Sequence, residues 1–411
     1  MLANLSSDIK QYLVVTGNYW AFTLTDGALR MLVVLHFHSL GYSPLQIAML
    51  FLFYEIFGVI TNLCGGWLGA RIGLNRTMNI GLFLQILALG MLLVPAAMLT
   101  VPWVMAAQAL SGTAKDLNKM SAKSAIKILV PADAQNSLYQ WVALLTGSKN
   151  ALKGAGFFMG GALLTAIGFA GAVMAMTAGL LLVFLTSLLL LKKDLGRATN
   201  KPRFTDIFSG DPAINRLSAA RMFLFSARDV WFVVALPVYL SQTLDWDHWQ
   251  TGGFLAAWVI AYGIVQALAP RLTGIARAAP DGRNALRWAC ILATVPALIA
   301  LGLMSSTAVS IFMNPATVLI VGLMMFGVVF AINSALHSYL IVSYARADGV
   351  SLDVGFYYMA NAMGRLLGTV LSGWVFQVAG LVACLWISCA MIVLTALISI
   401  RLPARHQGLS S

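Results

Sequence analysis

The chain is poor in charge, and in negative charge above all. Only 10% of its 411 residues are charged, with 26 Lys and Arg against 14 Asp and Glu. Together with a mean hydropathy of +0.85, this low charged fraction excludes an ordinary soluble globular protein. A net charge of +12 would suit nucleic-acid binding in a soluble protein. In a membrane protein basic loops explain it, so we expect a lipid bilayer and no nucleic acid as partner.

Cysteine is scarce as well. The four cysteines, Cys64, Cys290, Cys384 and Cys389, lie in apolar segments without CxxC spacing, which excludes a disulfide framework. No nucleophile–base pairing or metal-ligand spacing occurs, so we expect no enzyme, no metal and no cofactor. Residues 1–11 lack an apolar stretch, so we expect no signal peptide.

Hydrophobic residues dominate instead, at 60% of the chain. At about 20 residues per membrane crossing, they predict an all-α integral membrane protein with twelve transmembrane helices. The predicted spans are 12–36, 44–67, 77–98, 102–124, 137–165, 169–191, 215–241, 250–272, 286–305, 315–344, 353–378 and 380–401. A polar segment with Pro202 and Pro212 follows the sixth span. It predicts two six-helix bundles, 1–193 and 215–411, joined by a cytoplasmic linker at 194–214.

Basic residues alternate from loop to loop. The loops after the odd-numbered spans contain no Lys or Arg, whereas the other loops and both tails do. The basic loop and tail residues are Lys10, Arg71, Arg76, Lys127, Lys192, Lys193, Arg197, Lys201, Arg203, Arg277, Arg283, Arg346 and Arg405. Because positive loops stay on the cytoplasmic side, we expect both termini in the cytoplasm and the chain in a bacterial inner membrane.

An internal repeat relates 147–168 to 359–380, at an offset of 212 positions. The offset pairs Lys153 with Arg365, Gly156 with Gly368, Gly160 with Ser372, Gly161 with Gly373 and Gly168 with Gly380. Both copies place a cation inside a span and small residues after it, which allow close helix packing. Because a cation at that depth costs about 2.5–3.5 kcal/mol, it normally faces a partner or a polar cavity.

We interpret the repeated cations, with Lys149 one turn before Lys153, as opposite walls of one anion-binding cavity. The alternative is that each cation neutralises a buried carboxylate. The same two interpretations apply to the first span, where Asp26 and Arg30 share a face. The two could form an ion pair, or both could line the cavity with Asp26 as a proton carrier. Glu55 in the second span is likewise a proton carrier or the partner of an arginine.

Four lysines, Lys115, Lys119, Lys123 and Lys127, recur every four residues in the fourth span, with Asp116 beside the first. Lys115 lies too deep to reach the surface easily, so we expect Lys115 and Lys119 to lie deepest in a basic cytoplasmic vestibule. Lys123 and Lys127 could extend to the membrane surface as snorkelling residues.

In the second half, Arg221 and Arg228 lie one heptad apart, and Asp229 is a third candidate proton carrier. Asn333 and His337 share a helix face in the tenth span, where satisfied hydrogen bonding is the more common explanation for such a pair. In total the predicted membrane interior holds eight basic residues and four acids. This surplus favours a cargo that carries several negative charges, such as a phosphorylated compound. The candidate substrate-binding residues are Arg30, Lys115, Lys119, Lys149, Lys153, Arg221, Arg228, Asn361 and Arg365.

The segment GGWLGARIGLNR, 65–76, resembles the cytoplasmic loop motif of the major facilitator superfamily, Gly-x-Leu-Ala-Asp-Arg-x-Gly-Arg-Lys. Gly66, Leu68, Arg71 and Gly73 match, whereas Ala70 replaces the aspartate. The resemblance implies a transporter whose two six-helix halves enclose a substrate site, with Gly66, Arg71 and Gly73 in the gating loop. The missing aspartate removes the charge relay that gates this loop in the family.

Residues 22–79 resemble the opening of the organoarsenical efflux permeases of this superfamily, the ArsJ family. The run Thr25-Asp26-Gly27-Ala28-Leu29-Arg30 is the most specific part of the resemblance. It implies a monomeric exporter of the small organic anion 1-arseno-3-phosphoglycerate, which would confer arsenate resistance. Glyceraldehyde-3-phosphate dehydrogenase, which makes this ester, would be the functional partner. The alternatives are a proton-coupled exporter of another phosphorylated metabolite or drug, and a membrane sensor or scaffold.

Overall fold

The computed structural model describes residues 7–41, 50–130, 135–192, 195–246, 248–273, 279–304 and 314–404. Over these ranges the chain is built of helices and turns, without a strand. The α-helices are α1 (Ser7–Ser39), α3 (Leu52–Ile72), α4 (Leu74–Met91), α5 (Val101–Leu129), α6 (Gln135–Leu190), α7 (Pro212–Phe232), α8 (Ala235–Thr243), α9 (His248–Leu272), α10 (Gly282–Met304), α11 (Pro315–Tyr344) and α12 (Val350–Ser399). Two short 3-10 helices are η2 (Ala96–Met98) and η3 (Phe204–Ile207).

These helices confirm the predicted all-α membrane fold. The two longest, α6 and α12, each contain a glycine with non-helical geometry and therefore comprise two spans. If α7 and α8 count as one span, the helix order matches the twelve predicted spans. Six described stretches are long and apolar enough to cross a membrane by length and composition. They are Asn136–Leu190, Pro212–Thr243, Gln250–Leu272, Gly282–Met304, Pro315–Tyr344 and Val350–Ser399.

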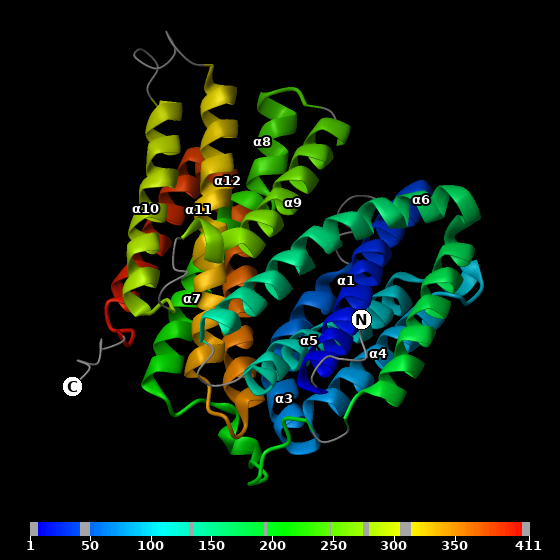
Figure 1. Cartoon of the computed structure of the whole chain (residues 1–411). Helices are drawn as coiled ribbons and strands as arrows, with labels where there is room; N and C mark the ends of the chain where they lie inside the picture. Colours follow the sequence, from blue (N-terminus) through cyan, green and yellow to red (C-terminus); the bar gives the residue numbers. More distant parts are fainter. Residues whose placement is uncertain are drawn as a thin grey trace, which may run out of the picture. The chain divides into compact units, whose positions relative to one another are not determined.

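The interruptions of α6 and α12 occur at repeat-related glycines. Gly168 has φ 69° and ψ 178°, and Gly380 has φ 74° and ψ −175°. Their separation, 380 − 168 = 212, is the offset of the sequence repeat. Because a side chain disfavours positive φ, glycine is the natural residue for such a reversal. Figure 1 shows the ribbon of α6 reversing direction near its label. The repeat therefore includes the backbone conformation as well as residue types.

The chain divides into two compact units. The first comprises residues 1–209 and 345–359, and the second comprises 210–344 and 360–411. One boundary thus falls in the polar segment after α6, and another falls inside α12, between Met359 and Ala360. The first turns of α12 accordingly pack with the first unit. The basic residues Lys193, Arg277 and Arg405 lie outside the described residues.

Repeat-related glycines set the helix packing inside each unit. In the first unit, a Cβ atom on Gly156 would lie 2.5 Å from the Leu24 carbonyl oxygen, so α6 and α1 touch through their backbones. In the second unit, a Cβ atom on Gly368 would lie 2.7 Å from the Ser226 carbonyl oxygen, so α12 lies equally close to α7. This close approach brings the cation-bearing turns of α6 and α12 next to the acid-bearing turns of α1 and α7.

The helix that packs against α6 in the first unit, α1, is continuous, whereas the corresponding region of the second unit is divided into α7 and α8. The chain leaves helical hydrogen bonding between α7 and α8, where the hydroxyl oxygen of Ser372 accepts the Val234 N–H at 3.2 Å and the Ala235 N–H at 3.1 Å. A membrane interior offers no water to a freed N–H group, so such an acceptor is needed. Ser372 occupies the repeat position of Gly160, which packs closely against Ala28 of the unbroken α1.

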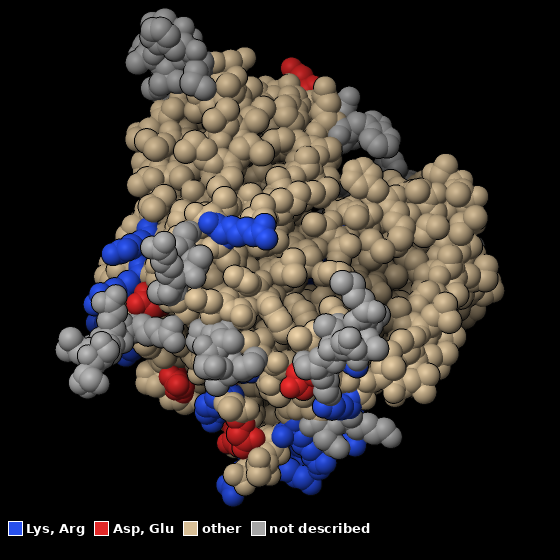
Figure 2. Space-filling view, in the orientation of Figure 1, with Lys and Arg blue, Asp and Glu red and all other residues tan. Residues whose placement is uncertain are grey.

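Large apolar side chains cover much of the outer surface. Leu182 and Leu189 of α6 are 68% and 84% exposed, and Trp374 of α12 is 64% exposed. Figure 2 shows wide areas of one face that carry no charged side chain. Contiguous apolar surface on this scale is typical of a protein that faces lipid. The polar residues described next are instead largely turned inward.

Candidate functional site

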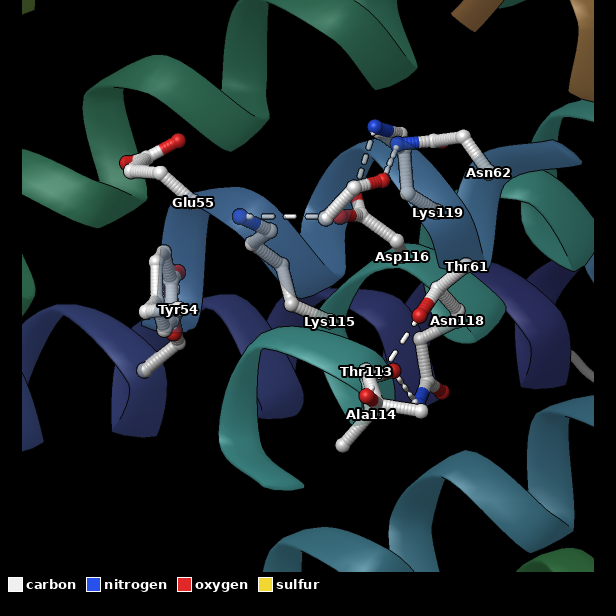
Figure 3. Close-up of polar contacts among 12 residues, drawn as sticks. Tyr54, Glu55, Thr61, Asn62, Thr113, Ala114, Lys115, Asp116, Asn118 and Lys119 are labelled. Atoms are coloured by element: carbon white, nitrogen blue, oxygen red, sulfur yellow. Dashed lines mark hydrogen bonds and ion pairs between the residues drawn. The ribbon is translucent and has the colours of Figure 1, made fainter. Parts of the chain in front are cut away.

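In the first unit, two of the predicted substrate-binding lysines share one carboxylate. Lys119 Nζ lies 2.5 Å from Asp116 Oδ1, and Lys115 Nζ lies 3.7 Å from Asp116 Oδ2. Figure 3 shows both ammonium groups converging on Asp116. The Asp116 side chain is only 2% exposed. A single buried carboxylate therefore holds two of the four lysines that recur along α5.

Tyrosine rings cover this lysine cluster. Lys115 Nζ lies 3.8 Å from the ring centroid of Tyr54, while Lys119 and Lys123 lie 4.7 Å and 4.8 Å from that of Tyr358. Lys123 Nζ also donates a hydrogen bond to the Tyr358 hydroxyl. Lys123 is 2% exposed, so the expectation that it extends to the membrane surface is wrong. The aromatic faces stabilise cations that the low-dielectric interior would otherwise disfavour.

Asp26 and Arg30 of α1 take different partners instead of pairing with each other. Both Asp26 carboxylate oxygens accept from the Tyr54 hydroxyl, at 2.8 Å and 3.1 Å. Arg30 forms an ion pair with Glu55 at 3.2 Å and lies 4.8 Å from the Tyr54 ring centroid. Asp26 thus depends on a neutral hydroxyl, whereas Glu55 has a permanent cation beside it. The two candidate proton carriers have different electrostatic surroundings.

Lys149 and Lys153 lie on α6 where this helix packs against α1. A Cβ atom on Gly27 would lie 2.6 Å from the Lys153 carbonyl oxygen, so the turn of Lys153 touches the residue that follows Asp26. Both lysines are partly buried. The close packing, which Gly27 and Gly156 allow from the two sides, brings the repeated cation of this unit to the level of Asp26.

In the second unit, two arginines share one carboxylate. Arg228 Nη2 lies 2.5 Å from Asp229 Oδ1, and Arg365 Nε lies 3.4 Å from Asp229 Oδ2. The Asp229 side chain is 1% exposed, whereas that of Arg365 is 35% exposed. Arg365, the repeat mate of Lys153, therefore belongs to this cluster and remains partly accessible.

Arg221 lies one heptad before Arg228 on α7 and contacts the same aromatic ring. Its guanidinium carbon lies 3.9 Å from the Phe225 centroid, and that of Arg228 lies 4.9 Å from it. Arg221 Nε donates to Asn361 Oδ1 at 2.8 Å, and Nη1 donates to the Ser334 carbonyl oxygen at 3.2 Å. Predicted site residues Arg221 and Asn361 are thus in direct contact.

In the polar pair of α11, Asn333 has the expected hydrogen bonds as a donor, whereas His337 has none among the described residues. Asn333 donates to the carbonyl oxygens of Trp288 and Val329, at 2.9 Å and 3.1 Å. His337 is fully buried, and neither ring nitrogen has a hydrogen-bond partner among the described residues. Sequence reasoning also overlooked Tyr54 and Tyr358. An aromatic residue beside Glu55 was the one available signal for the first, while the contacts of the second depend on tertiary packing alone.

Five of the eight predicted interior cations therefore contact three carboxylates. The alternative in which the cations neutralise buried acids describes these contacts correctly for Arg30, Lys115, Lys119, Arg228 and Arg365. It does not explain why cations outnumber carboxylates in these clusters, since Asp116 and Asp229 each contact two cations.

Comparison with known proteins agrees with this architecture. The sequence profile of the Major Facilitator Superfamily matches residues 13–341, which is most of the chain. The chain belongs to the major facilitator superfamily. No curated protein matches it by sequence. As a superfamily member it is a multi-pass membrane protein of a transporter family whose members bind small molecules and work as monomers.

Solved transporters share the fold at low sequence identity. The human organic anion transporter MFSD10 (TETRAN) superposes with a TM-score of 0.74 at 16% identity, covering 96% of this chain and 100% of that chain. The E. coli fucose:proton symporter FucP gives 0.73 at 12% identity, covering 97% and 100%. A bacterial homologue of the iron transporter ferroportin, in an outward-facing state, gives 0.73 at 13% identity, covering 97% and 99%. At these identities the likeness concerns the fold alone.

The superfamily loop motif covers the last turns of α3 and the start of α4 in the first unit. Gly73 ends α3 with φ 100°, a value that favours glycine. Gly66 accepts a hydrogen bond from the Ser351 hydroxyl at 2.7 Å, and its missing side chain lets the start of α12 approach. Arg71 lies 5.1 Å from the Trp67 ring centroid. Since Ala70 replaces the motif aspartate, this major facilitator protein makes the loop contact through backbone packing and the serine hydroxyl.

Proposed function

We propose that the chain exports an organic oxyanion across the bacterial inner membrane by alternating access, with 1-arseno-3-phosphoglycerate as its cargo. The observation that carries the proposal is the sharing of carboxylates: Asp116 contacts two lysines, and Asp229 contacts two arginines. Within a membrane, ionisable residues that face inward mark substrate or ion pathways. Two such clusters, one in each unit, both carry more positive than negative groups.

The chemistry of these clusters favours an oxyanion over other cargo classes. Guanidinium groups form paired hydrogen bonds with phosphate-like oxygens, and ammonium groups bind them as point charges. A cation in either cluster can exchange its carboxylate partner for an incoming oxyanion without leaving a buried charge unpaired. A transporter of cationic drugs would favour the opposite charge balance.

The resemblance of residues 22–79 to the ArsJ family supplies the specific cargo. The ester 1-arseno-3-phosphoglycerate carries a phosphate and an arsenate group, so its two anionic ends suit a site with several cations. Glyceraldehyde-3-phosphate dehydrogenase would make the ester from arsenate inside the cell, and its export would confer arsenate resistance. Trivalent arsenic, which seeks thiols, is not involved, so the scattered cysteines are compatible with this cargo.

Asp26 is the acid that we propose for proton coupling. It is 6% exposed, and its described contacts are with the neutral Tyr54 hydroxyl. Asp26 can take up a proton without breaking any ion pair among the described residues, whereas protonation of Glu55 would break its ion pair with Arg30. Asp229 contacts two arginines and is therefore the least suited of the three candidates. Protons that enter the cell by way of Asp26 would drive export. We place both chain termini in the cytoplasm.

Direct transport tests this proposal. Everted vesicles, in which export becomes uptake, receive the ester made on site from glyceraldehyde 3-phosphate, arsenate and NAD by added glyceraldehyde-3-phosphate dehydrogenase. We expect arsenic to accumulate, faster when the vesicle interior is acidified, and vesicles that lack the protein provide the control. If arsenic does not accumulate above that control, the arsenical cargo is wrong.

The alternative is a proton-coupled exporter of another phosphorylated metabolite or drug, which Asp26 would serve equally well. For a drug or metabolite cargo that lacks an oxyanion, transport should survive Lys153→Ala and Arg365→Ala. Competition with phosphorylated metabolites in the same vesicles, followed by uptake of the best competitor, distinguishes this alternative from the arsenical cargo.

A further inference from the structure

A buried polar cluster in the second unit has a member without a hydrogen-bond partner in the described part of the chain. Arg221 is 3% exposed and is held by the Asn361 side chain and the Ser334 carbonyl oxygen. His337 follows Ser334 by three positions on α11, so the two lie on adjacent turns of one helix face. His337 therefore belongs to the surroundings of Arg221.

His337 is one of several buried side chains with an unpartnered polar atom, and it shares with Gln85 the lack of a partner at both polar atoms among the described residues. The His337 side chain is 0% exposed. Buried polar side chains nearly always have at least one partner, so a group without one calls for an explanation such as a bound solute. Polar side chains inside membrane helices follow the same rule more strictly, because lipid cannot replace a missing partner. A solute that passes through the protein can supply one.

We propose that His337 and Arg221 together form a subsite for a hydroxyl group next to an oxyanion, so that the cargo is a hydroxylated organic anion. A neutral imidazole carries one N–H donor and one acceptor nitrogen, which matches a hydroxyl group that also donates and accepts. A guanidinium held in a fixed direction by Asn361 and Ser334 suits the neighbouring oxyanion. This inference rests on the proposed function and deepens it by naming the residues that would recognise the hydroxyl group of the cargo.

The neighbouring arginine cluster gives the subsite its direction. Arg228 follows Arg221 by seven residues on α7, which is a rise of about 10 Å along the helix. Phe225 lies between them and contacts both guanidinium groups. A solute of a few carbon atoms can thus place one anionic end at Arg221, its hydroxyl at His337 and its other anionic end toward Arg228. Burial of the site fits a transporter that encloses its cargo before release.

Binding of two probes that differ by one hydroxyl group tests the proposal. The probes are 3-phosphoglycerate and 3-phosphooxypropanoate, which lacks the 2-hydroxyl, titrated against the purified full-length protein in lipid nanodiscs. We expect the wild-type protein to bind 3-phosphoglycerate at least about 10-fold more tightly, because a site built around a hydroxyl discriminates strongly against its loss. In His337→Leu we expect this ratio to fall to about 1, mainly through weaker binding of the hydroxylated probe.

Two further variants separate recognition from folding. His337→Gln keeps a donor and an acceptor, so we expect it to recover part of the preference. His36→Leu, in which the altered imidazole stacks on Phe169 in the first unit, should retain all of it. Equal binding of the two probes by the wild-type protein, or an unchanged ratio in His337→Leu, overturns the inference. If neither probe binds saturably, the inference is also overturned. The proposed function is tested separately, by arsenic uptake into vesicles.

Discussion

The two units hold their buried carboxylates with different cations. In the first unit Asp116 contacts two lysines that are covered by the rings of Tyr54 and Tyr358. In the second unit Asp229 contacts two arginines, of which Arg228 donates from both Nε and Nη2. An ammonium group on a flexible stem adjusts to its partner, whereas a planar guanidinium fixes a direction. The two clusters lie on different helices of their units, α5 in the first and α7 with α12 in the second, whereas the close packing at Gly156 and Gly368 is common to both repeats.

The difference extends to the helices that carry these groups. The unbroken α1 packs backbone to backbone against α6 through Gly156 and Gly160, whereas the corresponding region of the second unit is interrupted between α7 and α8. Ser372, in place of Gly160, accepts the N–H groups at the interruption. A rigid, directional site in the second unit and an adjustable one in the first would divide the work of orienting and attracting an anion.

Removal of the repeated cations should have the largest effect. Lys153→Ala and Arg365→Ala each lose a charged contact of about 1.5–3 kcal/mol, which lowers uptake about 10–150-fold and abolishes arsenate resistance. Resistance is measured by growth on arsenate and membrane content by immunoblot. Lys153→Arg should retain part of the activity, whereas Arg365→Lys should retain little, because only arginine binds an oxyanion bidentately.

The exposed Lys201 and Arg271 provide matched controls. Alanine at either position should leave resistance unchanged. Normal resistance in both Lys153→Ala and Arg365→Ala would show that neither residue belongs to the substrate site. The difference between the lysines of the first unit and the arginines of the second would then have no bearing on transport.

The two acids of the first unit should behave unequally. Asp26→Asn should abolish the stimulation of uptake by a proton gradient, because the carboxylate that gains and loses the proton is gone. Glu55→Gln breaks a partly exposed pair with Arg30 worth about 0–1 kcal/mol, so we expect less than about a fivefold loss. Vesicle uptake with and without a gradient measures both. If uptake by Asp26→Asn still responds to the proton gradient, a residue other than Asp26 couples transport to protons.

Close helix packing gives a smaller, structural effect. In Gly160→Ala the new methyl group would overlap the Ala28 carbonyl, and in Gly368→Ala it would lie 2.7 Å from the Ser226 carbonyl oxygen. We expect each to lower the free energy of unfolding by about 1–3 kcal/mol. Thermal unfolding in detergent measures the change.

Two neighbouring glycines serve as controls for packing. At Gly161 the nearest atom would lie 3.8 Å away, and Gly373 has nothing within 4 Å, so alanine should be tolerated at both. Equal melting temperatures for Gly160→Ala and Gly161→Ala would show that α1 and α6 do not depend on the close contact.

The smallest effect should come from the interrupted helix. Ser372→Ala leaves the Val234 and Ala235 N–H groups without their acceptor, at a cost of about 0.6–1.5 kcal/mol. Thr369→Ala, on the same helix, is the control, because it removes a hydroxyl that donates to the Arg365 carbonyl oxygen of its own helix. If the two variants melt at the same temperature, the serine does not support the interruption.

Periodicity and composition predicted the fold well, because hydrophobic length and loop charge are local properties of a membrane chain. The tenth span, 315–344, coincides with α11, and the predicted breaks near 168 and 379 coincide with the glycine reversals. The repeat at an offset of 212 residues could be detected in the sequence for the same reason, since small residues recur where two helices pack closely.

Individual partners were far less predictable. Spacing placed Asp26 beside Arg30 on one helix face, yet the first takes Tyr54 and the second takes Glu55, both from α3. Lys123 had the spacing of a surface lysine but lies beneath Tyr358. Neighbours along a helix follow from the rise of 1.5 Å per residue, whereas neighbours across helices depend on how far each helix is rotated and shifted.

The sequence by itself determined the membrane class, the number and order of spans, the internal repeat and the surplus of cations over acids. These properties depend on residue type and spacing, which a membrane constrains strongly. Tertiary structure alone decided that two carboxylates are each shared by two cations, that Asp26 has a neutral partner and that His337 has none among the described residues. Such choices depend on backbone approach at a few glycines, because a shift of one helix by a single turn would give every polar side chain a different neighbour.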